Sequence, residues 1–113
     1  MLPSFPNLFI VYGPNTNGAL NVASFHELVT LFALQCMERL ILEDKQCVEV
    51  TEDAYWRYNE LVDARNERKH WSDPRAHNYY RNKYGRSSTQ CPFRGTEMWH
   101  FLRRPDFEEV IVR

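Results

Sequence analysis

The sequence has little glycine and lacks the glycine-rich motifs that bind nucleotide phosphates. Its 113 residues include four glycines, and neither GxGxxG nor GxxxxGK[ST] occurs. Both motifs work by bringing main-chain amides close to a phosphate group. No dinucleotide or phosphate-loop site of the usual kind is therefore expected from this chain alone.

Cysteine, excess charge and long apolar runs are scarce as well. The three cysteines form no C-x-x-C pair, which excludes a disulfide framework and a zinc knuckle, and the spacing of the four histidines suits no metal site. Lys and Arg (14) nearly balance Asp and Glu (15), which argues against nucleic-acid binding. No run approaches the ~18 apolar residues of a membrane helix, and no secretion signal is visible. The expectation is a cytoplasmic protein with reduced, mostly buried thiols and no membrane contact.

The first half of the chain predicts a strand, a turn and a helix. Residues 8–12 (LFIVY) form a short apolar run between turn-forming residues, which is typical of a strand buried on both faces. Residues 13–18 (GPNTNG) predict a tight turn, since Gly and Asn tolerate positive φ. The spacing of Ser24 and Glu27 predicts a capping box and a helix over 24–42, beginning there or one turn earlier.

The predicted helix 24–42 is apolar on more than one side. Its polar positions form one narrow stripe: Glu27, Thr30, Gln35 and Glu38. A helix of this kind is normally buried on several faces, and the rest of the chain offers too little apolar surface to cover it. We therefore expect helix 24–42 to pack against protein outside this chain or against a second copy, which makes a homo-oligomer, most simply a dimer, the expected state.

The second half predicts a second helix and an irregular C-terminal region. Thr51 can cap an amphipathic helix that runs to about Lys69. A short helix is expected over 96–102, ending before Pro105, and residues 110–112 predict a short strand. The whole is a single α+β unit over 1–113, with a strand–turn–helix part (1–50) and a helix-and-loop part (51–113).

A basic segment without acidic residues runs from Arg75 to Arg94. It holds five basic residues interleaved with Tyr79, Tyr80 and Tyr84. A solvated loop is the plainer interpretation, and a module that holds an anionic ligand is the alternative. Within it, Cys91 precedes a proline in a predicted loop, yet no neighbouring base supports a nucleophilic role.

These segments occur in the same order in a known family. The chain resembles, over nearly its whole length, the C-terminal end of Baeyer–Villiger flavin-containing monooxygenases, particularly the 4-hydroxyacetophenone monooxygenase-like branch. The resemblance rests on FPNLF at 5–9, YGPNTN at 12–17, the apolar helix, CPFRG at 91–95 and RRPD at 103–106. It implies that this chain is a fragment of an α/β FAD-binding fold.

The resemblance also implies cofactors and a site. In that family, FAD is reduced by NADPH, reacts with O2, and an oxygen atom is inserted into a ketone or added to a heteroatom. The matching turn lies beside the flavin, which makes five residues cofactor-binding by resemblance: Gly13, Pro14, Asn15, Thr16 and Asn17. Residues 91–95 would lie near the nicotinamide cofactor and substrate. No catalytic or metal-binding residue is assigned.

The chain also departs from the family. The two dinucleotide fingerprints and the catalytic arginine region of a full-length member have no counterpart here, and residues 18–21 (GALN) replace Leu-Gly-His-like residues. The resemblance thus implies a piece that completes the flavin pocket but is inactive alone, with the missing FAD and NADPH domains as its partner. The alternative is a free-standing interaction protein that dimerises through helix 24–42.

Overall fold

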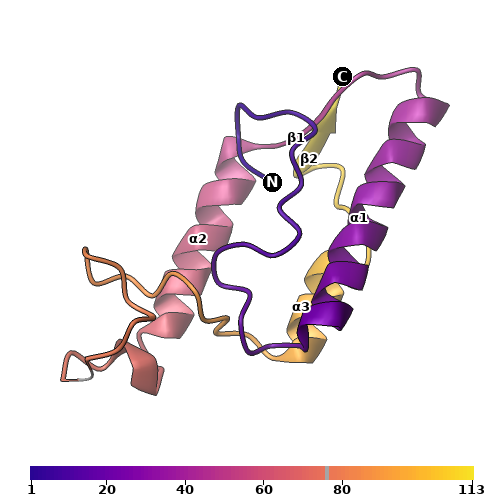
Figure 1. Cartoon of the computed structure of the whole chain (residues 1–113). Coiled ribbons are helices and arrows are strands. Elements are labelled where there is room, and N and C mark those ends of the chain that lie inside the picture. The colour runs from indigo at the N-terminus through magenta and orange to yellow at the C-terminus, as the bar shows by residue number, and fades with distance from the viewer. Residues whose placement is uncertain (76) are drawn as a thin grey trace.

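Three α-helices and one two-stranded sheet build the part of the chain that the structure describes. The computed structural model describes residues 1–75 and 77–113. Its elements are α1 (Val22–Leu42), β1 (Val48–Val50), α2 (Glu52–Asn66), the 3-10 helix η1 (His70–Ser72), α3 (Gly95–Leu102) and β2 (Val110–Val112). The predicted mixed α+β class is confirmed. The molecule is elongated, with extents of 53 × 26 × 18 Å, and its two long helices lie on opposite sides, with α3 beside the start of α1 (Figure 1).

Helix α1 begins one turn before the predicted cap. Asn21 is the N-cap, and its side-chain oxygen accepts a hydrogen bond from the amide of Ser24 at 2.9 Å. The capping box predicted from Ser24 and Glu27 is therefore wrong, and the earlier of the two expected starts is the observed one. The reason is that Asn is at least as good an N-cap as Ser.

Helix α2 starts at its predicted cap. The hydroxyl oxygen of Thr51 accepts from the amide of Ala54 at 3.1 Å, as expected. The helix ends at Asn66, sooner than the predicted Lys69, because Asn66 is used to turn the chain: its carbonyl accepts from the amide of Lys69 (2.9 Å), and its side-chain oxygen accepts from the indole of Trp71 (2.8 Å).

The sheet joins the middle of the chain to its end. Strand β2, predicted from its apolar sequence, pairs antiparallel with β1, so that Val48 faces Val112 and Val50 faces Val110. Strand β1 was not predicted, because three residues give almost no periodic signal. The carbonyl of Arg113 extends the pairing by accepting from the amides of Gln46 and Cys47.

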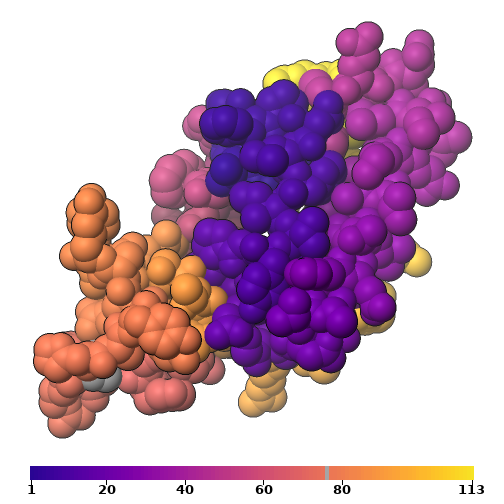
Figure 2. All heavy atoms as spheres, viewed as in Figure 1, coloured from indigo at the N-terminus to yellow at the C-terminus, as the bar shows by residue number. Residues whose placement is uncertain are grey.

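The strand predicted over residues 8–12 is wrong. This segment has no regular secondary structure, and Leu8, Val11 and Tyr12 are each about 40% exposed. A strand buried on both faces needs neighbouring strands, and within the described residues the two named strands pair with each other. The segment instead runs as a coil across the space between α1 and α2 (Figures 1 and 2).

Two small apolar clusters form the core among the described residues. One gathers residues from all three helices and the segment before α3: Phe25, Val29, Val62, Cys91, Phe93 and Met98. The other lies under the sheet and contains Cys36, Val48 and Val110, with Phe9 and Phe32 packed against it. Within the described part of the chain, no helix has both the length and the apolar character that crossing a membrane requires.

Candidate functional site

The turn at residues 13–18 is held against the segment before α3. The amide of Asn15 donates to the carbonyl of Ser88 (3.1 Å), and the amide of Asn17 donates to the carbonyl of Thr89 (3.0 Å). In return, the amide of Cys91 donates to the carbonyl of Asn17 at 2.8 Å. The two segments, far apart in the sequence, are thereby fixed side by side.

Asn15 is the centre of this junction. Its side chain is 6% exposed, and its amide nitrogen donates to the carbonyls of Ser87 (2.9 Å) and Gln90 (3.0 Å). Its φ of 56° lies in the left-handed region, which Asn tolerates better than most residues. Asn15 therefore satisfies main-chain groups that would otherwise be buried without partners.

The rest of the turn is braced from within. The hydroxyl of Thr16 donates to the carbonyl of Gly13 at 2.6 Å, and the hydroxyl of Tyr12 donates to the side-chain oxygen of Asn17 at 3.2 Å. A Cβ on Gly13 would lie 2.6 Å from a methyl carbon of Ile10, so a side chain there would require Ile10 to move. Pro14 and Asn17 remain exposed to solvent.

Four of the five residues predicted to face a cofactor divide into two groups, and the fifth, Gly13, accepts the hydrogen bond from Thr16 through its carbonyl. The side chains of Asn15 and Thr16 are engaged with this chain's own carbonyls, whereas Pro14 and Asn17 form the outward surface of the turn. The structure also joins the turn to Cys91, the first residue of the 91–95 segment predicted to lie near the nicotinamide cofactor. Sequence reasoning missed residues 87–90, because no local pattern marks them as the turn's partner.

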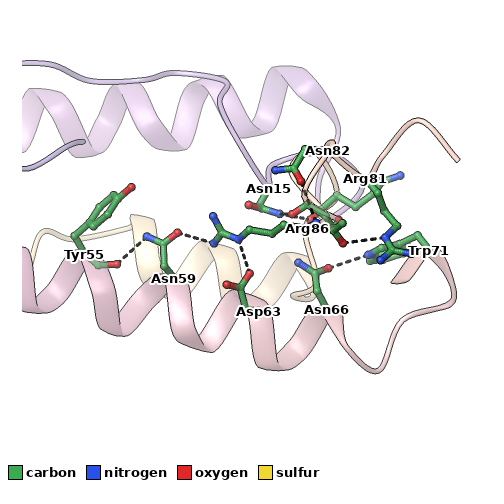
Figure 3. A network of polar contacts seen from close by, with 12 residues as sticks. Asn15, Tyr55, Asn59, Asp63, Asn66, Trp71, Arg81, Asn82 and Arg86 are labelled. Carbon is green, nitrogen blue, oxygen red and sulfur yellow. Dashed lines mark hydrogen bonds and ion pairs between the residues drawn. The ribbon is translucent and has the colours of Figure 1, made fainter. Parts of the chain in front are cut away.

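Polar contacts of Arg86 tie the basic segment to α2, in addition to the packing of Cys91 and Phe93 against Val62. The guanidinium of Arg86 donates to the carboxylate of Asp63 (2.7 Å) and to the side-chain oxygen of Asn59 (2.8 Å), as Figure 3 shows. At its start, Arg75 pairs with Asp73 at 2.7 Å. The prediction of an irregular segment is confirmed over its described residues, 75 and 77–94.

The cysteines and histidines offer no reactive centre within the described residues. Cys91 is 4% exposed, and burial raises the pKa of its thiol, which opposes a nucleophilic role. The three cysteines are free thiols, two of them buried as predicted, and no described group of three or more His, Cys, Asp or Glu side chains suits a metal ion.

An apolar surface on α1 faces solvent. Leu31, Leu34, Met37 and Ile41 lie on one side of the helix, and we call them the α1 face; Leu34 is 55% and Ile41 80% exposed. Phe32, in contrast, packs against the cluster under the sheet. As expected, the rest of the chain leaves part of its longest helix uncovered, namely the α1 face. Contiguous exposed apolar residues of this kind mark contact surfaces.

Comparison with known proteins relates the chain to a monooxygenase. It is 28% identical, over an alignment of 115 positions, to an uncharacterized monooxygenase, y4iD, of Sinorhizobium fredii. The alignment covers 96% of this chain and 17% of that protein, so the chain spans about one sixth of its relative's length. No family model matches the chain, and no solved structure matches it.

Proposed function

We propose that this chain is the C-terminal part of a flavin-dependent monooxygenase of the Baeyer–Villiger type and is inactive alone. The observation that carries the proposal is the coverage of the match, which includes 96% of this chain but 17% of a protein named a monooxygenase. A match that covers nearly all of this chain and a small share of its relative is what one part of a larger enzyme would give. The missing glycine-rich motifs fit it too, because they would lie in the remainder.

The turn at residues 13–18 would form one wall of the flavin pocket. FAD, when bound, supplies the oxygen chemistry. The outward parts of Pro14 and Asn17 are free to contact a planar ring, while the buried amide of Asn15 holds the main chain in place. The residues present therefore suit an edge of a cofactor site, and the NADPH side would lie beyond Cys91.

The α1 face would be the contact with the remaining domains. Burial of a Leu or Ile side chain stabilises a complex by roughly 1.5–3 kcal/mol. Leu34, Met37 and Ile41 would thus contribute part of the free energy that holds this part on the FAD domain. The same face explains why the isolated chain is expected to self-associate.

The proposal is tested by reconstituting the enzyme from two chains. This chain is co-expressed with a version of the S. fredii relative that lacks the matching segment. We expect the two to co-purify with FAD, detected by flavin absorbance in the complex peak, and to oxidise NADPH. Leu34→Glu should abolish the complex, whereas Ala64→Glu, on the exposed side of α2, should leave it intact.

Two results would overturn the proposal. One is a relative that binds FAD and oxidises NADPH equally well without this chain. The other is that this chain forms a well-defined dimer without flavin, does not bind the relative, and becomes monomeric in the Leu34→Glu variant. The second result would establish the free-standing interaction protein instead.

A further inference from the structure

A solvent-open cavity lies in the first half of the basic segment. Its volume is about 490 Å³, and it is lined by Pro74 and by residues within 77–85. His77, Arg81 and Lys83 contribute basic groups, and Tyr79 contributes an exposed aromatic ring. None of the described lining residues is acidic. This volume falls within the range of small-molecule sites, about 300–1,000 Å³.

A tight hairpin holds Arg81 in position. The amide of Asn82 donates to the carbonyl of Arg86, and the amide of Gly85 donates to the carbonyl of Asn82, both at 2.9 Å. The Nε of Arg81 then donates to the carbonyl of Gly85 at 2.9 Å. Arg81 is therefore fixed through one nitrogen, which leaves its terminal nitrogens available to a ligand.

Gly85 is required for this arrangement. Its φ is +82°, in the region that side chains disfavour, and a Cβ there would lie 3.0 Å from a terminal nitrogen of Arg81. The hairpin thus combines a strained turn with a close approach between backbone and guanidinium, two features that glycine alone accommodates without cost.

The charges of Arg81 and Lys83 are not neutralised. Among the basic residues of this segment, Arg75 pairs with Asp73 and Arg86 pairs with Asp63. Neither Arg81 nor Lys83 forms an ion pair with any residue that the structure describes; Lys83 lies 4.9 Å from the ring centre of Tyr84. Two cations that line one cavity and have no carboxylate partner among the described residues favour the binding of an anion.

We propose that this cavity binds a small molecule that carries a phosphate ester and a planar ring, such as a mononucleotide. Arg81 and Lys83 would hold the phosphate, and the ring of Tyr79 would stack on the planar group. A nucleic acid is disfavoured, because tight binding needs a longer row of cations, and the chain carries a net charge of −1. This inference does not depend on the monooxygenase proposal.

The test is a titration of the full chain with AMP, followed by backbone amide NMR shifts. We expect saturable shifts at residues 77–85. The double variant Arg81→Gln/Lys83→Gln should weaken binding by about tenfold or more, because it removes two charge-assisted contacts. The matched control Arg103→Gln/Arg104→Gln neutralises the same charge away from the cavity and should change the Kd less than about twofold. Lys83→Gln alone, at an exposed position, serves if the double variant misfolds, and should weaken binding several-fold.

Two further probes separate the parts of the ligand. Adenosine should not bind saturably, and inorganic phosphate should shift the same amides with a weaker Kd. The proposal is overturned if AMP gives no saturable shifts, if both double variants weaken binding equally, or if adenosine binds as tightly as AMP. Inorganic phosphate binding as tightly as AMP would overturn the role of Tyr79 and the planar ring.

Discussion

The side-chain nitrogen of Asn15 lies 3.0 Å from the carbonyl oxygen of Gln90, a residue 75 positions later in the chain. This contact helps to link the turn at residues 13–18 to the segment that leads into α3. The same nitrogen also donates to the carbonyl of Ser87, so the Asn15 side chain holds the turn in place through two hydrogen bonds. The shape of that turn, and anything that binds to it, depends on this amide.

Asn15→Asp should destabilise the fold by roughly 2–4 kcal/mol, because it replaces a donor with an acceptor that faces two carbonyls. Asp keeps the size of the side chain and tolerates positive φ, so backbone strain is not the cause. Asn15→Gly, which relaxes the backbone but also loses both hydrogen bonds, should cost less than Asp. Urea unfolding checks both, and an Asp variant as stable as the original would refute the role assigned to this amide.

Gly95→Ala should lower the free energy of unfolding by about 1–3 kcal/mol through overpacking. A Cβ at this position would lie 2.7 Å from a methyl carbon of Leu20 and 2.9 Å from the carbonyl oxygen of Ala19. Alanine is otherwise the better helix former, so propensity predicts the opposite sign. Thr96→Ala, at the exposed next position, is the control in thermal melts and should be nearly neutral.

Cys36 should make stability fall at high pH. Burial raises the pKa of its thiol from 9.0 to about 11. Between these values the unfolded thiol loses its proton and the folded one keeps it, so the contribution is complete below pH 9 and is lost as the pH rises to about 11. The slope is at most about 1.4 kcal/mol per pH unit. Urea unfolding across this range should show the slope, and Cys36→Ala should reduce it. The remainder is expected from Cys91, because burial raises the pKa of that thiol as well.

Glu97 should make the start of α3 sensitive to acid. The amide of Arg94 donates to its carboxylate at 2.8 Å, and together with Arg65 it lowers the pKa of Glu97 below 4.5. Since the folded pKa is depressed, the stabilisation is present above pH 4.5 and is lost as the pH falls through the folded value. The amide shift of Arg94 should follow this titration in NMR spectra. Glu97→Gln should abolish the shift change, and an unaltered curve would contradict the contact.

The helices could be predicted from the sequence because their signals are local. Thr51 caps α2 within three residues, and an apolar pattern continuous from Phe25 to Ile41 marks α1 without knowledge of its surroundings. Residues 8–12 carried an equally clear local signal and still form no strand. Whether an apolar run becomes a strand depends on partners elsewhere, and in this chain α1 and α2 flank it instead.

The site was less predictable, since its geometry is built from distant contacts. The turn could be recognised by its Gly, Pro and Asn residues, yet its docking on residues 87–91 leaves no trace in local spacing. Likewise, the five basic residues could be counted in the sequence, but their ion pairs could not be predicted. The structure shows that Arg86 pairs with Asp63, and that Lys83 forms no ion pair with a described residue.

The pairing of β1 with β2 also sets an order of events during folding. Residues 48–50 have their strand partner at 110–112, so the sheet cannot form until the ribosome has added those much later residues. Helix α1 can form well before that, and the cluster beneath the sheet stays open on one side until Val110 arrives. A nascent chain therefore displays its most apolar helix before its own closing element exists, and that interval is when a chaperone or a folding partner domain would matter most.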